Sequence, residues 1–581
     1  MNEVKIEING VELSAPADLT ILQAARLGDV DIPTLCHLDL HNPQVTFKEA
    51  SCRVCMVEIE GRKNLAPACI TTITEGMRVK TSTPRAIRAR RTSVELLLSD
   101  HPQDCLVCEK NQNCDLQQLA AKLGLRNELK YQGAMSCYEK DCSSNSIQRN
   151  PDKCVLCRRC EIMCNDFQTC GVLSAVGRGF ETIIKPTFGL PMRETACTFC
   201  GQCVAVCPTA ALSEMSVVSE VWDAINNPDK FVVVQTAPAV RVALGEEFGM
   251  EPGQAVTGKM VALLRKLGFD RVFDTDFAAD LTIIEEASEF VHRLQHNGTL
   301  PILTSCCPAW VKFFEHQFPD LMAIPSSCKS PHEMFGAIAK SYYCEKFGID
   351  PQRLIVVSVM PCLAKKYEAA RPELSNKGSR NVDHVITTRE LAKMAKEAAI
   401  DFKVLEDEVF DNPLGESTGA SVIFGATGGV IEATLRTAYE WLTETTLEKV
   451  DFEELRGMKG IKSATVKING MDVRIAVAHG LGNARTLLES IRDGSCRYHA
   501  IEIMACPGGC VGGGGQPYHH GDIEVLKART RAIYNEDRNK TLRKSHENSY
   551  VQELYKEFLG KPYQDKAIKF LHTHYTEREN I

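Results

Sequence analysis

The 581-residue sequence has no long apolar run and no excess of positive charge. No segment approaches the roughly 18 uninterrupted apolar residues of a membrane span, and residues 1–9 lack the basic and then apolar layout of a secretory signal. The formal net charge is −8, so no basic face for nucleic acid is expected. These absences predict a cytoplasmic protein that binds neither membranes nor nucleic acid.

Cysteine, in contrast, is abundant, with 26 residues in a chain too long to need disulfide staples. Most of these cysteines lie in clusters with two-residue gaps, where neighbouring thiolates can converge on one metal centre but would form strained disulfides. The pattern therefore predicts metal binding. The length of the chain predicts about three to five domains.

Residues 1–80 predict a 2Fe-2S domain of the beta-grasp type. Two alternating runs are joined by Asn9-Gly10, which is a strong hairpin signal, and a helical segment follows. Widely spaced thiolates around one close pair suit a 2Fe-2S cluster, and the region resembles plant-type ferredoxins. A four-cysteine zinc site is the alternative. The candidate ligands are Cys36, Cys52, Cys55 and Cys69.

Residues 81–140 contain a second candidate site, preceded by a basic helical stretch at 84–100. One histidine and three cysteines can hold zinc or a 4Fe-4S cluster. The position between two iron-sulfur signatures favours the 4Fe-4S cluster, and the spacing resembles that of iron-iron hydrogenases and respiratory complex I subunits. The candidate ligands are His101, Cys105, Cys108 and Cys114.

Residues 141–215 carry the motif C-x2-C-x2-C-x3-C twice, which predicts a ferredoxin-like domain with two 4Fe-4S clusters. In such domains the fourth cysteine of each run binds the other cluster. The first cluster would use Cys154, Cys157, Cys160 and Cys207, and the second would use Cys197, Cys200, Cys203 and Cys164. One 2Fe-2S and three 4Fe-4S clusters would then form an electron relay to a reaction further along the chain.

Residues 216–520 predict a large, two-lobed α/β catalytic domain. Five apolar runs, which read as buried parallel strands, alternate with helical segments: 231–238, 301–308, 354–362, 421–429 and 500–509. Ligands bind beyond the carboxyl ends of such strands, and the remaining clustered cysteines follow three of these runs.

Residues 521–581 predict a helical tail, with an amphipathic helix at 542–560 that lies on the catalytic domain or at an interface.

Three motifs of the catalytic half resemble the signatures of iron-iron hydrogenases: TSCCPAW at 304–310, MPCLAKKYE at 360–368 and EIMACPGGCVGGGGQP at 502–517. The resemblance covers almost the whole chain, and the tail resembles that family's small-subunit segment. It implies reversible conversion of H2 to protons and electrons at an H-cluster. A 4Fe-4S cube would be bridged by Cys510 to a di-iron unit with carbon monoxide, cyanide and an azadithiolate. The ligands of the cube would be Cys307, Cys362, Cys506 and Cys510.

The resemblance also assigns roles around the di-iron unit. Lys365 would donate to a cyanide ligand, although a surface lysine is the alternative for this residue type. Met360, Met504 and Pro238 would line the pocket, and Ala239 stands where the family often has serine. A proton relay would run through Cys306, Glu286, Glu289, Ser326 and Arg293. For the helix that carries Glu286, Glu289 and Arg293, a solvated charged face is the alternative.

Six further cysteines are not predicted ligands. Cys328 follows the relay serine and is expected to face the di-iron pocket, where its thiol would cap the open iron site reversibly under oxidising conditions. The other five lack partners at ligand spacing and are expected to be buried apolar residues or free thiols. They are Cys137, Cys142, Cys170, Cys344 and Cys496.

The resemblance also suggests partners. The glycine strings lack a G-x-G-x-x-G motif in a β-α-β unit, so no nicotinamide or flavin site is expected within the chain. The full relay resembles hydrogenase subunits that work with flavin- and NAD(P)-binding partners and ferredoxin, and maturation enzymes would install the di-iron unit. A monomeric ferredoxin-dependent hydrogenase, a hydrogen sensor and an iron-sulfur scaffold protein are the alternatives.

Overall fold

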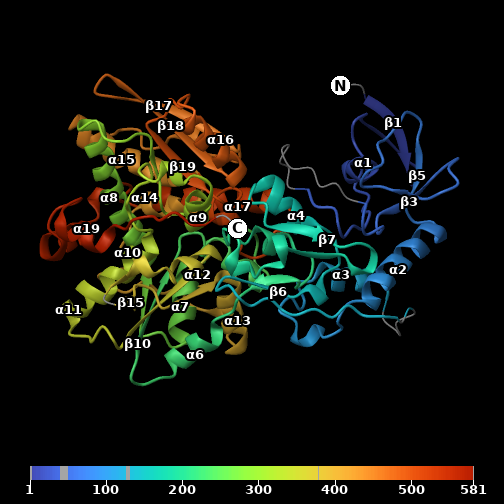
Figure 1. Cartoon of the computed structure of the whole chain (residues 1–581), viewed down its shortest axis with the longest axis horizontal. Helices are drawn as coiled ribbons and strands as arrows, with labels where there is room; N and C mark the ends of the chain where they lie inside the picture. Colours follow the sequence, from blue (N-terminus) through green and yellow to red (C-terminus); the bar gives the residue numbers. More distant parts are fainter. Residues whose placement is uncertain (1–2, 40–49, 126–130, 132, 377, 580–581) are drawn as a thin grey trace.

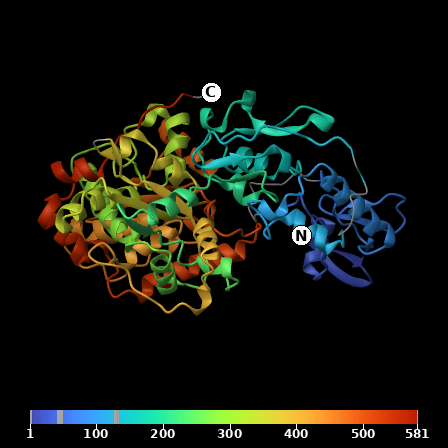
Figure 2. The same ribbon diagram turned by 90° about the horizontal axis from the view of Figure 1, so that it is seen from below.

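The computed structural model describes residues 3–39, 50–125, 131, 133–376 and 378–579. Figures 1 and 2 show the N-terminal strands at one end of the molecule and the catalytic half at the other. The segment that contains α4 (Arg159–Ile162) and β7 (Leu173–Val176) lies between them.

The N-terminal sheet has the mixed strand order of a beta-grasp fold, β2-β1-β5-β3-β4. Asn9 and Gly10 have φ values of 53° and 85°, which is the left-handed geometry of the predicted tight hairpin, and β1 pairs in parallel with β5. The strands are β1 (Glu3–Ile8), β2 (Val11–Pro16), β3 (Met56–Ile59), β4 (Ala66–Pro67) and β5 (Arg78–Lys80), and α1 spans Ile21–Leu27.

The next two segments are built from short elements around cysteine loops. The predicted basic helix is α2 (Pro84–Ser99), and α3 (Asp115–Lys122) follows it. In the ferredoxin-like segment, β6 pairs with β9 and β7 pairs with β8, and a short helix starts within each cysteine run. These elements are β6 (Ile147–Arg149), α4, β7, β8 (Ile183–Pro186), α5 (Gln202–Val206) and β9 (Leu212–Glu214).

The catalytic domain has two four-stranded sheets, which correspond to the two predicted lobes. The order β11-β10-β13-β16 is entirely parallel, and the order β12-β19-β18-β17 is mixed because β17 and β18 form an antiparallel hairpin. The strands are β10 (Phe231–Thr236), β11 (Arg271–Asp274), β12 (Ile302–Leu303), β13 (Leu354–Met360), β16 (His384–Thr387), β17 (Ile461–Ile468), β18 (Met471–His479) and β19 (Ala500–Met504), with a separate ribbon of β14 (Ser375–Asn376) and β15 (Ser379–Arg380).

Helices cover both sheets. The longest, α8 (Thr275–Gln295), packs against α10 and α15 and carries the candidate relay residues. The others are α6 (Val218–Ile225), α7 (Thr257–Lys266), α9 (Pro308–Gln317), α10 (Pro331–Ile338), α11 (Cys344–Phe347), α12 (Ala364–Glu368), α13 (Thr388–Glu397), α14 (Gly419–Val422), α15 (Gly429–Thr443) and α16 (Leu481–Arg492). No helix within the described ranges is both long and apolar enough to cross a membrane.

One predicted strand is wrong. Residues 421–429 form the end of α14, a 3-10 turn at Ile423–Gly425 and the start of α15. The run is apolar because it is buried on all sides, and an apolar run without periodicity does not distinguish a buried strand from a buried helix. The run at 301–308 contributes only the two residues of β12, since α9 begins at Pro308.

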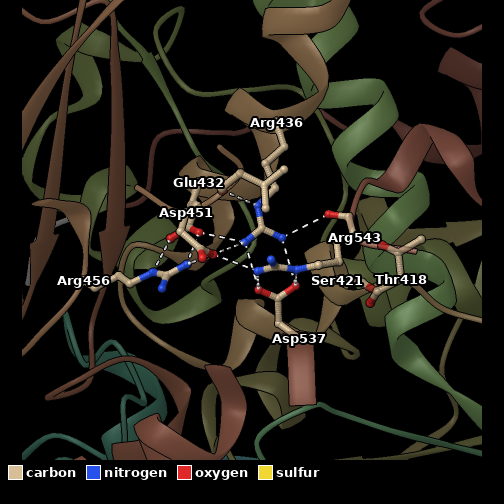
Figure 3. A network of polar contacts seen from close by, with 9 residues as sticks. Thr418, Ser421, Glu432, Arg436, Asp451, Arg456, Asp537 and Arg543 are labelled. Atoms are coloured by element: carbon tan, nitrogen blue, oxygen red, sulfur yellow. Dashed lines mark hydrogen bonds and ion pairs between the residues drawn. The ribbon is translucent and has the colours of Figure 1, made fainter. Parts of the chain in front are cut away.

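The C-terminal tail packs on the catalytic domain as α17 (Ile523–Asn539), α18 (Ser549–Leu554) and α19 (Asp565–Leu571). The helix predicted at 542–560 is shorter, because Asn548 caps α18 and one π-helical turn ends it at Leu559. Figure 3 shows the charge network that fixes α17: Asp537 accepts from Arg436 at 2.9 Å and from Arg543 at 2.6 Å. The network comprises Glu432, Arg436, Asp451, Arg456, Asp537 and Arg543.

Candidate active site and iron-sulfur sites

A central cavity lies where strands of both sheets end. Cys362 follows β13, Cys506 and Cys510 follow β19, and Cys307 immediately precedes α9. The structure thus brings together four cysteines that are separated by up to 203 positions in the sequence. The non-ligand candidates Cys306, Lys365, Met360, Met504 and Pro238 line the same cavity.

The chemistry of these donors fits a metal cluster. Burial raises the pKa of the Cys362 thiol to about 12, so a cation is needed for thiolates to form there. The loop that carries Cys510 is packed closely: a Cβ on Gly509 would lie 2.6 Å from the Thr427 amide nitrogen, and one on Gly513 would lie 2.1 Å from the Pro361 carbonyl oxygen. Both glycines line the cavity, and the lack of a side chain lets this loop pack directly against the backbone of Thr427 and Pro361.

Lys365 is buried, which excludes the surface alternative. Its side chain is 11% exposed, and Nζ donates to the Cys306 carbonyl at 3.1 Å and to Glu368 Oε2 at 2.7 Å. The same oxygen of Glu368 lies 2.7 Å from His332 Nε2, and His332 also lines the cavity. Glu368 therefore holds the Lys365 ammonium group beside the cavity wall. Sequence reasoning missed Glu368 and His332, although Glu368 ends the MPCLAKKYE motif.

The relay candidates on α8 are buried, so the solvated-face alternative is wrong for Glu286 and Glu289, which are 3% and 2% exposed. Burial, followed by the charge of Glu289, raises the pKa of Glu286 to about 8, and neither carboxyl oxygen makes a full hydrogen bond within the described chain. The charge of Glu286 in turn contributes to the raised pKa of Cys306, after burial, which places the carboxyl near that thiol.

Ser326 and Arg293 complete the candidate relay. The Ser326 hydroxyl donates to Glu289 Oε2 at 3.0 Å, and Arg293 Nη2 donates to Glu289 Oε1 at 2.6 Å. The Arg293 side chain is 12% exposed and forms the outer end of this row. The five residues therefore form a row that runs from the cavity toward the surface.

The C-terminal tail adds residues to this row that sequence reasoning missed. His572 Nδ1 lies 2.8 Å from the Ser327 hydroxyl, which itself donates to Glu289 at 3.2 Å, and His572 Nε2 lies 2.9 Å from Glu285. The Tyr575 hydroxyl donates to the Ser326 carbonyl at 2.7 Å. The tail thus holds the segment that carries the relay serine.

Cys328 is not where it was expected. It is absent from the described lining of the cavity, and its sulfur lies within 4.8 Å of a Glu289 carboxylate oxygen and a His572 ring nitrogen. Ser326 and Cys328 both lie beside Glu289, since the Ser326 hydroxyl donates to Glu289 Oε2 at 3.0 Å, so Cys328 faces the relay and not the described lining of the cavity. The expectation that Cys328 caps the di-iron unit is therefore not supported by its position.

Two cavities in the ferredoxin-like segment separate its cysteines into the predicted sets. Cys154, Cys157, Cys160 and Cys207 line one small cavity. A second small cavity is lined by Cys164, Cys197, Cys200 and Cys203, and also by Cys170, for which no ligand position was expected. Beside this second cavity, burial and the charge of Cys307 raise the pKa of Cys200 to about 11, so the cavity adjoins the catalytic one.

The four candidate ligands of the N-terminal 2Fe-2S site also lie near one another. All four cysteines of the 2Fe-2S site are buried, and hydrogen bonds pair Cys36 with Cys52 and Cys55 with Cys69. These bonds lower the pKa of Cys36 and Cys55 and raise that of Cys52 and Cys69, so within each pair one thiol ionises more readily than the other.

At the histidine-containing site, burial lowers the pKa of His101, and its Nδ1 has no hydrogen-bond partner within the described chain. A neutral imidazole with a free nitrogen is the form that binds metal. Lys153 lies beside both His101 and Cys108, while Cys114 is buried and Cys105 is exposed.

The remaining unassigned cysteines are free thiols: Cys344 is buried, Cys496 is partly buried, and Cys137 and Cys142 are exposed.

Hydrogen bonds connect the iron-sulfur segments to each other. Arg159 donates to Asp115 and to the His37 carbonyl, both at 2.9 Å. Gln202 donates to the Gly512 carbonyl at 3.0 Å and so joins the ferredoxin-like segment to the catalytic loop.

The fold and these sites define an iron-sulfur oxidoreductase with a buried, sulfur-walled catalytic cavity. Family models match along the chain: the 2Fe-2S iron-sulfur cluster binding domain (1–84), the NADH-ubiquinone oxidoreductase-G iron-sulfur binding region (90–128), the 4Fe-4S binding domain (192–213), the iron only hydrogenase large subunit, C-terminal domain (230–514) and the iron hydrogenase small subunit (523–578).

Known proteins are similar over the same regions. NADP-reducing hydrogenase subunit HndD of Solidesulfovibrio fructosivorans is 61% identical over 587 residues, 100% of both chains. Iron hydrogenase 1 of Clostridium pasteurianum is 41% identical, covering 98% of this chain and 99% of that one. A solved variant of the FeFe-hydrogenase of Chlamydomonas reinhardtii is 43% identical, with a TM-score of 0.57 over 63% of this chain and 100% of that one.

The chain belongs to the iron-only hydrogenase family. It is an enzyme that acts on H2 and carries iron-sulfur domains N-terminal to its catalytic domain. The predicted fold class and the predicted family are confirmed.

Proposed function

We propose that the central cavity holds an H-cluster, at which the chain interconverts hydrogen with protons and electrons. The cavity wall carries this proposal: four cysteine sulfurs, the Cys306 thiol and the buried Lys365 ammonium meet there. When bound, the cluster supplies the Lewis-acid and redox chemistry that cleaves hydrogen. Its ligands would be Cys307, Cys362, Cys506 and Cys510, with Cys510 also bridging to the di-iron unit and its carbon monoxide, cyanide and azadithiolate ligands.

Other residues of the cavity would orient this unit and exclude water. Lys365 would donate a charge-assisted hydrogen bond to a cyanide ligand, held in place by Glu368. Met360, Met504 and Pro238 form apolar wall where water would otherwise reach the metal. Ala239 is fully buried and offers no hydroxyl, so its position provides no donor of its own.

Protons would pass along the row of residues on α8. Cys306 exchanges a proton at the cavity and passes it to Glu286, whose raised pKa of about 8 suits transfer near neutral pH. Ser326 donates a hydrogen bond to Glu289, which also accepts one from the partly exposed Arg293. Electrons would pass through one 2Fe-2S cluster, the histidine-ligated 4Fe-4S cluster and the two ferredoxin-like 4Fe-4S clusters.

We further propose that the chain is the catalytic subunit of a complex that couples H2 to NAD(P) and ferredoxin. The support is its likeness to a NADP-reducing hydrogenase subunit over the full length of both chains. The exposed Cys105 places the histidine-ligated site where a partner can exchange electrons with it. Maturation enzymes would supply the di-iron unit.

Anaerobic purification from the native host tests this assembly. We expect the chain to co-purify with flavin- and NAD(P)-binding subunits, and the complex to reduce NADP with H2. The isolated chain should reduce a viologen dye with H2 but not NADP, because its sequence has no G-x-G-x-x-G motif in a β-α-β unit. A chain that purifies alone and exchanges electrons with ferredoxin at the full native rate would instead establish the monomeric alternative.

A further inference from the structure

Five cysteines line the cavity of the second ferredoxin-like cluster, whereas four line the cavity of the first. The additional residue is Cys170, which belongs to neither C-x2-C-x2-C-x3-C run. It is placed there by a backbone hydrogen bond, in which the Cys170 N–H donates to the Cys164 carbonyl at 2.9 Å. The chain therefore folds back on itself so that Cys164 and Cys170 face the same small cavity.

The loop around Cys170 is held in an unusual conformation. Thr169 and Gly171, on either side, have φ values of 51° and 69°. A left-handed threonine is energetically unfavourable and persists only when its surroundings fix it. Arg485 of α16 fixes it here, since Nε donates to the Thr169 hydroxyl at 3.1 Å and Nη2 donates to the Thr169 carbonyl at 3.0 Å. The catalytic domain thus holds Cys170 against the cavity.

The Cys170 sulfur makes only long contacts in this position. It lies 3.5 Å from the Gln168 carbonyl oxygen and 3.8 Å from the Thr198 hydroxyl. Thr198 stands between Cys197 and Cys200 in the opposite ligand loop. Cys170 therefore lies between Cys164 and the loop that carries Cys197 and Cys200. It belongs to the group of thiols that would surround the cluster.

We propose that Cys170 is a reserve ligand of the second 4Fe-4S cluster and can replace Cys164. In this exchange, the Cys164 sulfur–iron bond breaks and Cys164 takes up a proton, while Cys170 loses a proton and its sulfur binds the same iron. The charge and oxidation state of the cluster do not change. The inference rests on the proposed cluster assignment.

The first cluster provides a matched control within the same chain. Cys207 is its fourth ligand, as Cys164 is for the second cluster, and the residue six positions after Cys207 is Ser213 rather than cysteine. The Ser213 hydroxyl accepts a hydrogen bond from Gln148 at 2.9 Å and is not among the described residues that line the first cavity. Among the residues that the structure describes, no fifth thiol lines the first cavity.

The test uses the full chain, produced without maturation enzymes, in which iron per chain and the electron paramagnetic resonance spectra of the reduced and oxidised forms are measured. We expect Cys164→Ala to keep all its iron, with a shifted signal for the reduced cluster and no three-iron signal in the oxidised form. The double variant Cys164→Ala/Cys170→Ala should lose about four iron atoms, as should Cys207→Ala. Cys170→Ala alone should keep all its iron.

The proposal is overturned if Cys164→Ala loses as much iron as the double variant, or if its oxidised form shows a three-iron cluster. Cys164→Ser is made in parallel in case the alanine variant does not fold, and its iron content must likewise fall when Cys170→Ala is added. Failure of the cluster assignment itself has a different signature, because the unchanged chain would then lack the expected four-iron signals.

Discussion

Replacing Glu286 with glutamine should lower hydrogen turnover by roughly 10²- to 10⁴-fold while leaving the metal content unchanged. Glutamine keeps the shape of the side chain, but its amide cannot accept and release a proton as the carboxyl does. Glu286 is a buried carboxyl whose charge, after burial, contributes to the raised pKa of Cys306, and its own pKa of about 8 allows it to change charge near neutral pH. The measurement is dye-linked hydrogen evolution by matured protein, with infrared spectra to verify the cofactor.

The matched control is Glu345→Gln, the same chemical change at an exposed position on α11. Its turnover should equal that of the unchanged enzyme, because Glu345 is remote from the relay. If Glu286→Gln retained a third or more of the normal turnover with intact infrared bands, protons would have to leave the cavity by another route.

Replacing Arg436 with alanine should destabilise the catalytic domain by about 3–5 kcal/mol. Arg436 is fully buried and bonds Asp537 at 2.9 Å and Glu432 at 2.8 Å, so its removal leaves two buried carboxylates with fewer cations (Figure 3). A loss of this size should lower the midpoint of the thermal transition of this domain by roughly 5–15 °C. Differential scanning calorimetry at one fixed scan rate measures it, because large proteins often unfold irreversibly.

Arg492→Ala provides the comparison. Its ion pair with Asp320 is exposed on both sides, with side chains 44% and 48% accessible, and should contribute at most about 1 kcal/mol. Equal shifts for the two variants would show that the C-terminal charge network does not fix α17 to the catalytic domain.

The cysteine sets were predictable because ligand spacing is a local property. Within each C-x2-C-x2-C-x3-C run, the step of three residues directs the fourth cysteine toward the other cavity, and the structure places Cys164 and Cys207 in that way. Cys170 was not predictable, because a backbone reversal brings it to the cavity and no motif records that reversal. The hairpin of β17 and β18 carries the same Asn-Gly signal at Asn469-Gly470 as the first hairpin, yet the sequence reading did not include it.

Contacts between distant segments also lay beyond sequence reasoning. His572 reaches Ser327 across 245 positions, and no ligand spacing or periodicity indicates that the tail touches the relay. Residues 421–429 were misread because burial on all sides removes the alternation that distinguishes strands from helices. Lys365 and the relay glutamates were assigned by resemblance alone, and their burial became visible only once the helices that carry them were packed.

Infrared spectroscopy of the protein produced with maturation enzymes tests the central claim most directly, because carbon monoxide and cyanide absorb where protein does not. The account predicts carbonyl and cyanide bands together with hydrogen activity, and loss of both in Cys510→Ala, which should keep the iron of the four N-terminal clusters. A fully iron-loaded, matured protein without these bands, or a Cys510→Ala variant that retains them, would contradict the assignment of the H-cluster to this cavity.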